Sequence, residues 1–101
     1  MGIRIAATNF DKTPDEVLYV EMDFSSVLST GATITSVNVA FDPSGELSEN
    51  VGARQISGQK VIFLLQGGTA GSDYEMEVEA TADNGETAEG VAFVVVRNPS
   101  S

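Results

Sequence analysis

The sequence predicts an all-β protein, an antiparallel β-sandwich of seven to eight strands. Short segments alternate apolar and polar residues, and turn residues recur about every ten positions between them. The only helical candidate is a single turn at Ser25–Leu28. A chain of 101 residues has the ordinary size of one domain, so residues 1–101 are expected to form a single sandwich with a frayed tail after Arg97.

The first half of the chain contains three clear strand candidates. Gly2–Ala7 is expected to be an edge strand, followed by a polar connector at Thr8–Glu16. Val17–Phe24 alternates regularly, which is typical of a half-buried strand. In Thr33–Phe41 the apolar residues change parity, so a β-bulge is expected near Thr35-Ser36.

The second half begins with two weak strand candidates, Glu46–Asn50 and Ala53–Ser57, and continues with the apolar strand Val61–Gln66. Asp73–Ala82 and Thr87–Arg97 complete the set. The turn between these last two strands determines which side chains face the core.

Asn84-Gly85 is a strong signal for a two-residue hairpin turn, in which both central residues have positive φ. With Asn84 and Gly85 as the loop, the outer face of the first strand carries Glu75, Glu77 and Glu79. The apolar pairs that then face the core are Tyr74 with Val95, Met76 with Phe93 and Val78 with Val91.

Some apolar residues then point away from the core and are candidates for an interface. If Val61, Phe63 and Leu65 face inward, their neighbours face outward, and the same holds for the residues beside Phe93 and Val95. The edge strand could also pair with a neighbouring subunit. The candidate interface residues are Ile62, Leu64, Val94, Val96, Ile3 and Ile5.

A glycine-rich crossing, Gly67-Gly68-Thr69-Ala70-Gly71, precedes the strand that begins near Tyr74. It lacks the spacing and the lysine of a phosphate-binding loop, so Gly67, Gly68 and Gly71 are interpreted as structural turn residues with positive φ. An inward Tyr74 needs a hydrogen-bond partner for its hydroxyl. Immunoglobulin-like and fibronectin type III domains have this layout, with the tyrosine bonded back to upstream backbone, so the sandwich is predicted to be immunoglobulin-like.

The composition argues against several functions. There are no histidines and no cysteines, so we predict no enzyme, no catalytic residues, no metal-binding residues and no cofactor. Loop carboxylates could in principle bind calcium, but no calcium-loop motif is present. The net charge of −10 predicts no binding to nucleic acid or to an anionic membrane. The longest apolar run, Val61–Leu65, is too short to span a bilayer.

Several stretches resemble the small immunoglobulin-like virion proteins of tailed bacteriophages, a group that includes fibre–tail adaptors. This chain has Phe24 where those proteins often have tryptophan. The stretches are Lys12-Thr13-Pro14, Val20–Leu28, Ile34–Val37, Leu65–Gly71 with Tyr74, and the last hairpin with Asn84-Gly85 and Phe93.

The resemblance implies a non-enzymatic structural protein of the virion, made in the cytoplasm of the bacterial host. Its partners would be other virion proteins of the head, neck, tail or fibre, and it would be present in many copies in a symmetric assembly. A fibre–tail adaptor and a capsid decoration protein both fit. The alternative is a carbohydrate- or surface-binding adhesin module, although Tyr19 is the one clear outward aromatic residue and there is no tryptophan.

Overall fold

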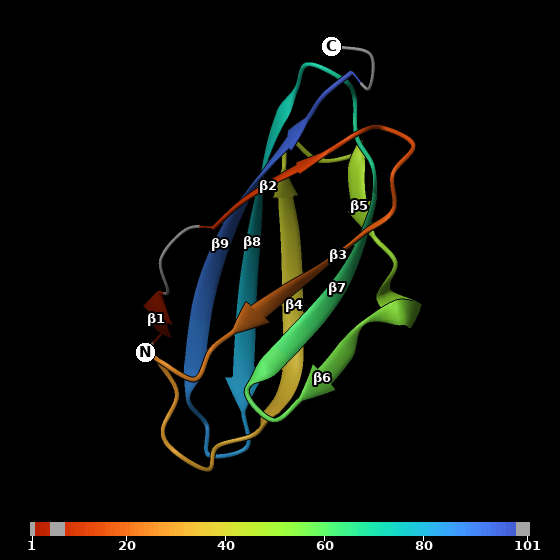
Figure 1. The fold of residues 1–101 in the computed structure, drawn as a ribbon. Helices are drawn as coiled ribbons and strands as arrows, with labels where there is room; N and C mark the ends of the chain where they lie inside the picture. The colour runs from red at the N-terminus through yellow and green to blue at the C-terminus, as the bar shows by residue number, and fades with distance from the viewer. Residues whose placement is uncertain (1, 5–7, 99–101) are drawn as a thin grey trace.

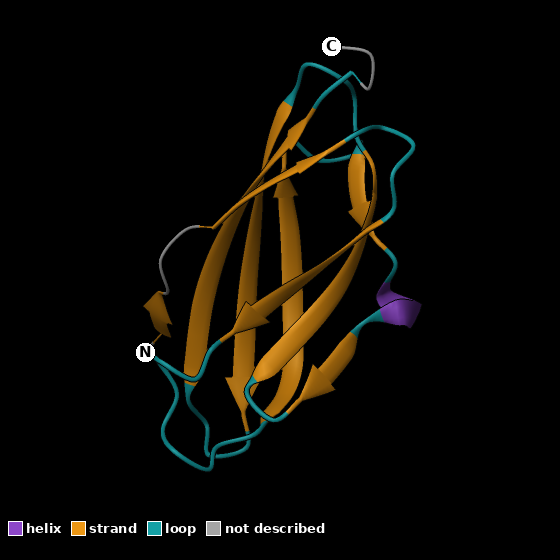
Figure 2. Ribbon diagram, in the orientation of Figure 1, coloured by secondary structure: helices purple, strands orange, loops and turns teal. Residues whose placement is uncertain are grey.

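The protein folds into two facing β-sheets, which Figures 1 and 2 show as crossed layers of strands. The computed structural model describes residues 2–4 and 8–98, and for residues 2–4 and 8 the backbone alone. A short 3-10 helix, η1 (Val51–Ala53), is the one helix in this part of the chain. The strands of the described residues are β1 (Gly2–Arg4), β2 (Thr8–Lys12), β3 (Leu18–Asp23), β4 (Ile34–Asp42), β5 (Leu47–Glu49), β6 (Gln55–Ser57), β7 (Lys60–Gly67), β8 (Asp73–Ala82) and β9 (Thr87–Val96).

One sheet, called sheet A, contains β4, β8 and β9 in that order, and both β1 and β2 pair with the far edge of β9. The other, sheet B, has β7 in its centre, with β3 on one side and β5 and β6 on the other. The predicted all-β sandwich is therefore confirmed. Its strands are not all antiparallel, because β1 and β2 run parallel to β9.

The core lies between the sheets, where alternate side chains of the facing strands exclude water. In β8 the even-numbered side chains are buried and the odd-numbered ones are exposed or half-buried, as the alternation predicts. In β3 the inward residues Val20 and Met22 are buried in the same way. The largest fully buried side chains are Tyr74, Phe24, Phe63, Leu47, Leu65, Met76, Val61, Val78, Val94 and Val96.

The hairpin between β8 and β9 differs from the prediction. The Ala82 N–H donates to the Glu86 carbonyl (2.8 Å), so three residues rather than two lie between this pair. Gly85 has a φ of +89°, whereas Asn84 does not have a positive φ. A three-residue loop with glycine in the left-handed region is one of the common hairpin connections. It changes the pairing of the two strands by one residue.

The changed register exchanges the inward and outward faces of β9 relative to the prediction. Tyr74 pairs with Val94 instead of Val95. Val94 and Val96 are fully buried, and Phe93 is 40% exposed on the outer face. The predicted inward positions of Phe93 and Val95 are wrong because a shift of one residue exchanges the two faces of a strand.

The prediction for Thr8–Glu16 as a connector is wrong in its first part, which is β2. Phe10 pairs with Val94 and Lys12 with Val96, so β2 extends sheet A beside the second half of β9. Its polar composition conceals this role in the sequence, because a strand at the sheet margin needs few apolar residues. The predicted bulge in β4 is confirmed, since the register with β8 shifts between Ile34 and Ser36.

Candidate docking surfaces

The described residues contain no group of three or more histidine, cysteine, aspartate or glutamate side chains arranged to hold a metal ion. In the same part of the chain, no helix combines the length and the apolar character that crossing a membrane requires. The features that stand out are instead two contrasting outer faces and two polar connections between the sheets.

The outer face of sheet B is apolar over its middle. The strict alternation of β3 turns Tyr19 outward, and the unbroken apolar run of β7 places Leu64 and Ile62 on the same side. Tyr19 pairs across the strands with Leu64 and is 60% exposed. Val51, which is 63% exposed, belongs to η1. This helix lies in the chain between β5 and β6, the two strands that pair with the other edge of β7. We call Tyr19, Val51, Ile62 and Leu64 the apolar face.

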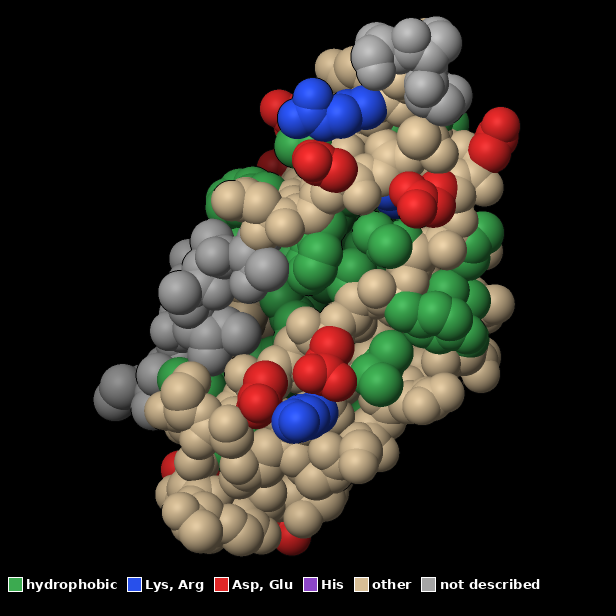
Figure 3. All heavy atoms as spheres, in the orientation of Figure 1, with side chains coloured by type: hydrophobic (Ala, Val, Ile, Leu, Met, Phe, Trp, Pro, Cys, Tyr) green, Lys and Arg blue, Asp and Glu red, His purple; other side chains and the backbone are tan. Residues whose placement is uncertain are grey.

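Figure 3 shows this side of the molecule, with hydrophobic side chains gathered over β3, β7 and the η1–β6 connection. Charged side chains lie above and below this hydrophobic patch in the view, and Glu21 of β3 pairs with Ile62 on the same sheet. Such a distribution, apolar in the centre and polar around it, is typical of a protein–protein interface.

The six predicted interface residues are not brought together. Ile62 and Leu64 lie on the outer face of sheet B, where both are half-buried. Val94 and Val96 are 0% exposed in the core, so the prediction for them is wrong, because the register of β9 turns them inward. Ile3 lies in β1, described by its backbone alone, at the register position of Ala88, and Ile5 lies outside the described residues.

The outer face of sheet A is acidic. Glu77 and Glu79 of β8 are exposed beside a shallow groove of about 280 Å³ that runs across β4, β8 and β9. Its lining includes Asn38 and Ala40 of β4, whose short side chains leave the space open, and Glu89 of β9, which pairs with Glu79. We call this region the acidic groove. It collects negative charge where a cationic partner would be stabilised.

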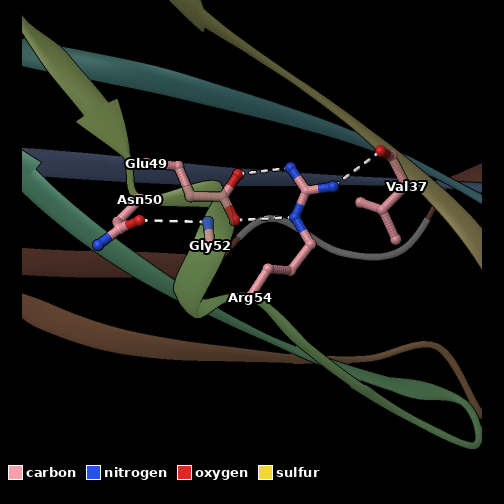
Figure 4. A network of polar contacts seen from close by, with 5 residues as sticks. All are labelled: Val37, Glu49, Asn50, Gly52 and Arg54. Atoms are coloured by element: carbon pink, nitrogen blue, oxygen red, sulfur yellow. Dashed lines mark hydrogen bonds and ion pairs between the residues drawn. The ribbon is translucent and has the colours of Figure 1, made fainter.

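A buried ion pair joins the two sheets along one margin of the sandwich. Arg54, just after η1, donates from Nε and Nη2 to the Glu49 carboxylate, at 2.8 and 2.6 Å, and from Nη1 to the Val37 carbonyl of β4, at 3.0 Å (Figure 4). The side chains of Arg54 and Glu49 are 16% and 3% exposed. We call these three residues the edge bridge. The hydrogen bonds that Arg54 donates to Glu49 raise the pKa of Arg54.

The backbone around Arg54 is prepared by a local cap and by an aromatic ring. Asn50 accepts a hydrogen bond from the Gly52 N–H through Oδ1 (3.2 Å), which starts the turn of η1 that aims Arg54 inward (Figure 4). The guanidinium also lies over the Phe63 ring, 5.8 Å from its centre.

A second polar connection, the end cluster, lies where β7 ends. The Tyr74 hydroxyl accepts a hydrogen bond from the Thr69 N–H (2.9 Å) and donates to Glu46 Oε1. Tyr74 is 1% exposed, so these partners satisfy a buried hydroxyl. The bond to Thr69 is the predicted contact with upstream backbone, an arrangement called the tyrosine corner, and the bond to Glu46 is an addition that the sequence did not suggest.

The glycines of this segment allow close approach. Gly67 has a φ of +81°, and a Cβ there would lie 2.7 Å from the Glu46 carbonyl oxygen. Gly68 has a φ of +96°, and a Cβ there would lie 2.7 Å from a methyl group of Val96. Gly71 also has a positive φ but borders open space. The segment is a turn packed against β5 and β9, with Gly67 and Gly68 required by both conformation and space.

Lys12, which we count as part of the end cluster, is 2% exposed. Its Nζ donates to the carbonyls of Gly67 (2.6 Å) and Thr13 (2.8 Å). Burial lowers the pKa of Lys12, and the nearby charges of Glu16 and Asp15 partly oppose this. Lys12 is buried because β2 carries its side chain beneath the crossing from β7 to β8.

The sequence did not single out Arg54, and it placed Phe93 in the core. Arg54 lies in a weak, polar segment, and only the fold brings it beside Glu49 and β4. Phe93 is the opposite case, an aromatic residue in an apolar strand that suggested burial. A signal for Arg54 could have been its position five residues after Glu49, within the strand–turn–strand segment that β5, η1 and β6 form.

Comparison with solved structures supports the fold. The chain is similar to part of a 2,6-sialyltransferase from Vibrionaceae Photobacterium sp. JT-ISH-224, crystallised with CMP and lactose, with a TM-score of 0.51 and 12% sequence identity. The match covers 97% of this chain and 18% of that one, so this chain spans less than a fifth of the enzyme. At such low identity the likeness concerns the fold alone.

Comparison of the sequence with curated proteins gave no significant match. Comparison with protein families did give one: residues 12–95 match the family described as "Podophage GP4 fiber-tail adaptor protein gp77". The matched range runs from the buried Lys12 to Val95, one residue before the end of β9, and includes the apolar face, the edge bridge and the end cluster. Because the match covers most of the chain, this protein belongs to the fibre–tail adaptor family gp77 of podophages.

Proposed function

We propose that this protein is a non-enzymatic structural component of a phage virion that joins fibre to tail by docking to other virion proteins. The observation that carries the proposal is the apolar face, where Tyr19 and Leu64 lie side by side and Tyr19 is 60% exposed. A monomer in water gains nothing from such a surface, whereas burying it in an interface is favourable. The family match supports the junction of fibre and tail as the site of this interface.

The proposed mechanism depends only on the shape of the protein and on the chemistry of its surface. The two sheets hold a rigid core, and the edge bridge and end cluster keep the sheets in one relative position. The apolar face then supplies affinity, and the acidic surroundings disfavour negatively charged partners. Many copies in a symmetric assembly, located in the virion, would follow from this role. The net charge of −10 speaks against nucleic acid as a partner.

The test replaces an exposed aromatic residue on each outer face and compares the virions. Phage carrying Tyr19→Lys in the gene for this protein should assemble particles that have lost most of their fibre proteins, as measured by mass spectrometry of purified virions. Phe93→Lys is the matched control, because Phe93 is a 40% exposed aromatic on the outer face of sheet A. It should leave fibre content unchanged.

Circular dichroism of the two purified variants checks that both are folded. A full complement of fibres in Tyr19→Lys particles would contradict docking through the apolar face. Location of the protein across the capsid surface, rather than at the junction of tail and fibre, would favour the decoration role over the adaptor role.

Exposed Tyr19 also favours a second candidate, a carbohydrate-binding adhesin module, since aromatic rings stack on sugars. A glycan array with the purified protein separates the two functions. Reproducible sugar binding that disappears in Tyr19→Ala, with fibre content unaffected, would favour the adhesin.

A further inference from the structure

We propose that β4 accepts an added strand: an extended segment of another protein, alternating basic and apolar residues, pairs with the free edge of β4 and lays its basic side chains over the acidic groove. The inference rests on the adaptor role in that it supplies a protein partner. It uses a different surface from the apolar face, so the two can be tested separately.

The hydrogen-bonding pattern identifies which backbone groups of β4 are free. In an antiparallel pair, hydrogen-bonded residues alternate along the strand. Ala82 donates to Glu86, so the even-numbered residues of β8 bond to β9 and the odd-numbered ones bond to β4. Their β4 partners are even-numbered, for example Asn38 opposite Glu79. Odd-numbered residues of β4 therefore direct their N–H and C=O groups away from β8.

One of these outward groups already has a partner. The Val37 carbonyl accepts the hydrogen bond from Arg54 in the edge bridge, which agrees with the alternation. Within residues 8–98, the edge-facing backbone groups of Val39 and Phe41 have no hydrogen-bond partner. The edge bridge thus covers the first half of β4 and leaves the second half open to a strand of another chain.

The side chains on the two faces of β4 determine which residues of the added strand should be apolar and which should be basic. Val39 and Phe41 point toward the core and are only half-buried, so apolar residues of an added strand would cover them. On the other face, Asn38 and Ala40 are short and open onto the acidic groove. A lysine or arginine there could extend over them toward the carboxylates of β8.

Charge complementarity selects a basic segment rather than a second copy of this chain. Glu77 and Glu79 lie one strand away from the free edge, and both are exposed. Pairing β4 with β4 of a second copy would bring together two chains that each carry a net charge of −10. A basic strand neutralises this charge, and its binding should weaken as salt is added.

The experiment titrates the isotope-labelled protein with a short synthetic peptide in which lysine alternates with valine, and follows amide signals by NMR. A peptide with glutamate in place of lysine is the charge control. The lysine peptide should shift the amide signals of Val39 and Phe41 and slow their hydrogen exchange. The glutamate peptide should do neither. Absence of these effects with the lysine peptide would overturn the proposal.

Two variants test the parts of the site separately. Val39→Pro removes an outward N–H, which an edge strand tolerates because no ladder bond to β8 is lost. It should weaken binding of the lysine peptide by about fivefold or more. The double variant Glu77→Gln with Glu79→Gln should weaken it similarly at low salt, and Glu21→Gln, on the outer face of sheet B, should not. Unchanged affinity in both the proline and the double variant would contradict the proposal.

If Val39→Pro does not fold, two other measurements still test the proposal. These are the amide exchange of the wild-type protein with the lysine peptide and the affinity of the double variant for that peptide. Virions separate this inference from the adaptor role. Loss of fibres in Tyr19→Lys but not in Glu77→Gln with Glu79→Gln, together with no peptide binding, would leave the adaptor role standing and reject strand addition. Peptide binding at β4, together with full fibre content in Tyr19→Lys virions, would support strand addition and contradict docking through the apolar face.

Discussion

The edge bridge and the end cluster both connect the two sheets through a cationic side chain. Each sends a cationic side chain from one sheet to a backbone carbonyl of the other: Arg54 to Val37 at 3.0 Å, and Lys12 to Gly67 at 2.6 Å. Both cations are largely removed from water, and both hold the margins of the sandwich together. They differ in what balances the charge.

Arg54 has its own counterion, because Glu49 accepts two hydrogen bonds from it, and these raise the pKa of Arg54. Lys12 bonds to carbonyls alone, and burial lowers its pKa. When one partner of a buried ion pair is removed, the other charge stays buried and the protein is strongly destabilised, whereas replacing Lys12 by an apolar side chain leaves no uncompensated charge behind. The comparison therefore predicts very different responses to substitution.

The largest effect is expected for Glu49→Gln, which leaves the buried Arg54 without its counterion. The free energy of unfolding should fall by about 3 kcal/mol. The midpoint of urea-induced unfolding measures this, with Glu77→Gln as an exposed control that should change little. Equal midpoints for the two variants would show that the edge bridge contributes nothing to stability.

Tyr74→Phe should have an intermediate effect in the end cluster. It removes the hydroxyl that Thr69 and Glu46 use, and the free energy of unfolding should fall by about 1 kcal/mol. Tyr19→Phe is the matched control, because the hydroxyl of the exposed Tyr19 is solvated in both the folded and the unfolded state. Urea midpoints that fail to separate the two variants would count against a structural role for the tyrosine corner.

Lys12→Met should have a smaller effect, within about 1 kcal/mol in either direction. The methionine side chain fills the space beneath the β7–β8 crossing, and the cost of desolvating an ammonium group disappears. The two carbonyls lose their donor, which opposes the gain. A loss as large as that of Glu49→Gln would show that Lys12 is as well compensated as Arg54, and the comparison would fail.

The dependence of stability on pH separates the two cations further. Because the pKa of Lys12 in the folded protein is lowered from 10.5, the unfolded chain binds more protons between the two values. Stability should therefore rise with pH in this alkaline window. The difference in unfolding free energy between wild type and Lys12→Met, measured by urea titration at several pH values, isolates this effect. A difference that stays flat or falls with pH would be inconsistent with it.

Several features followed from the sequence because a single physical pattern determines them. Strict alternation predicted that β3 is half-buried, and that β8 has Tyr74 inside and its three glutamates outside. The change of parity in β4 predicted its bulge. In each case one face had to be apolar and the other polar, so only one arrangement excluded water from the core.

The docking surfaces could be predicted only in part. Ile62 and Leu64 face outward as expected, because β7 is apolar on both faces and its inner set is fixed by Phe63. In β9, Val94 and Val96 share one face, and Phe93 and Val95 share the other. Both faces are apolar, so the sequence pattern does not determine which of them faces the core. The conformation of the loop before β9, together with the packing of Val96 against Gly68, makes that choice.

The sequence by itself determined the sandwich, the identity of its alternating strands and the acidic character of one outer face, because these depend on the period of two along each strand. Tertiary structure alone decided the register of β9, the strand at Thr8–Lys12, and the burial of Arg54 and Lys12. These features depend on contacts between segments far apart in the chain. A polar residue becomes a core residue only when the fold places carbonyls or a counterion around it.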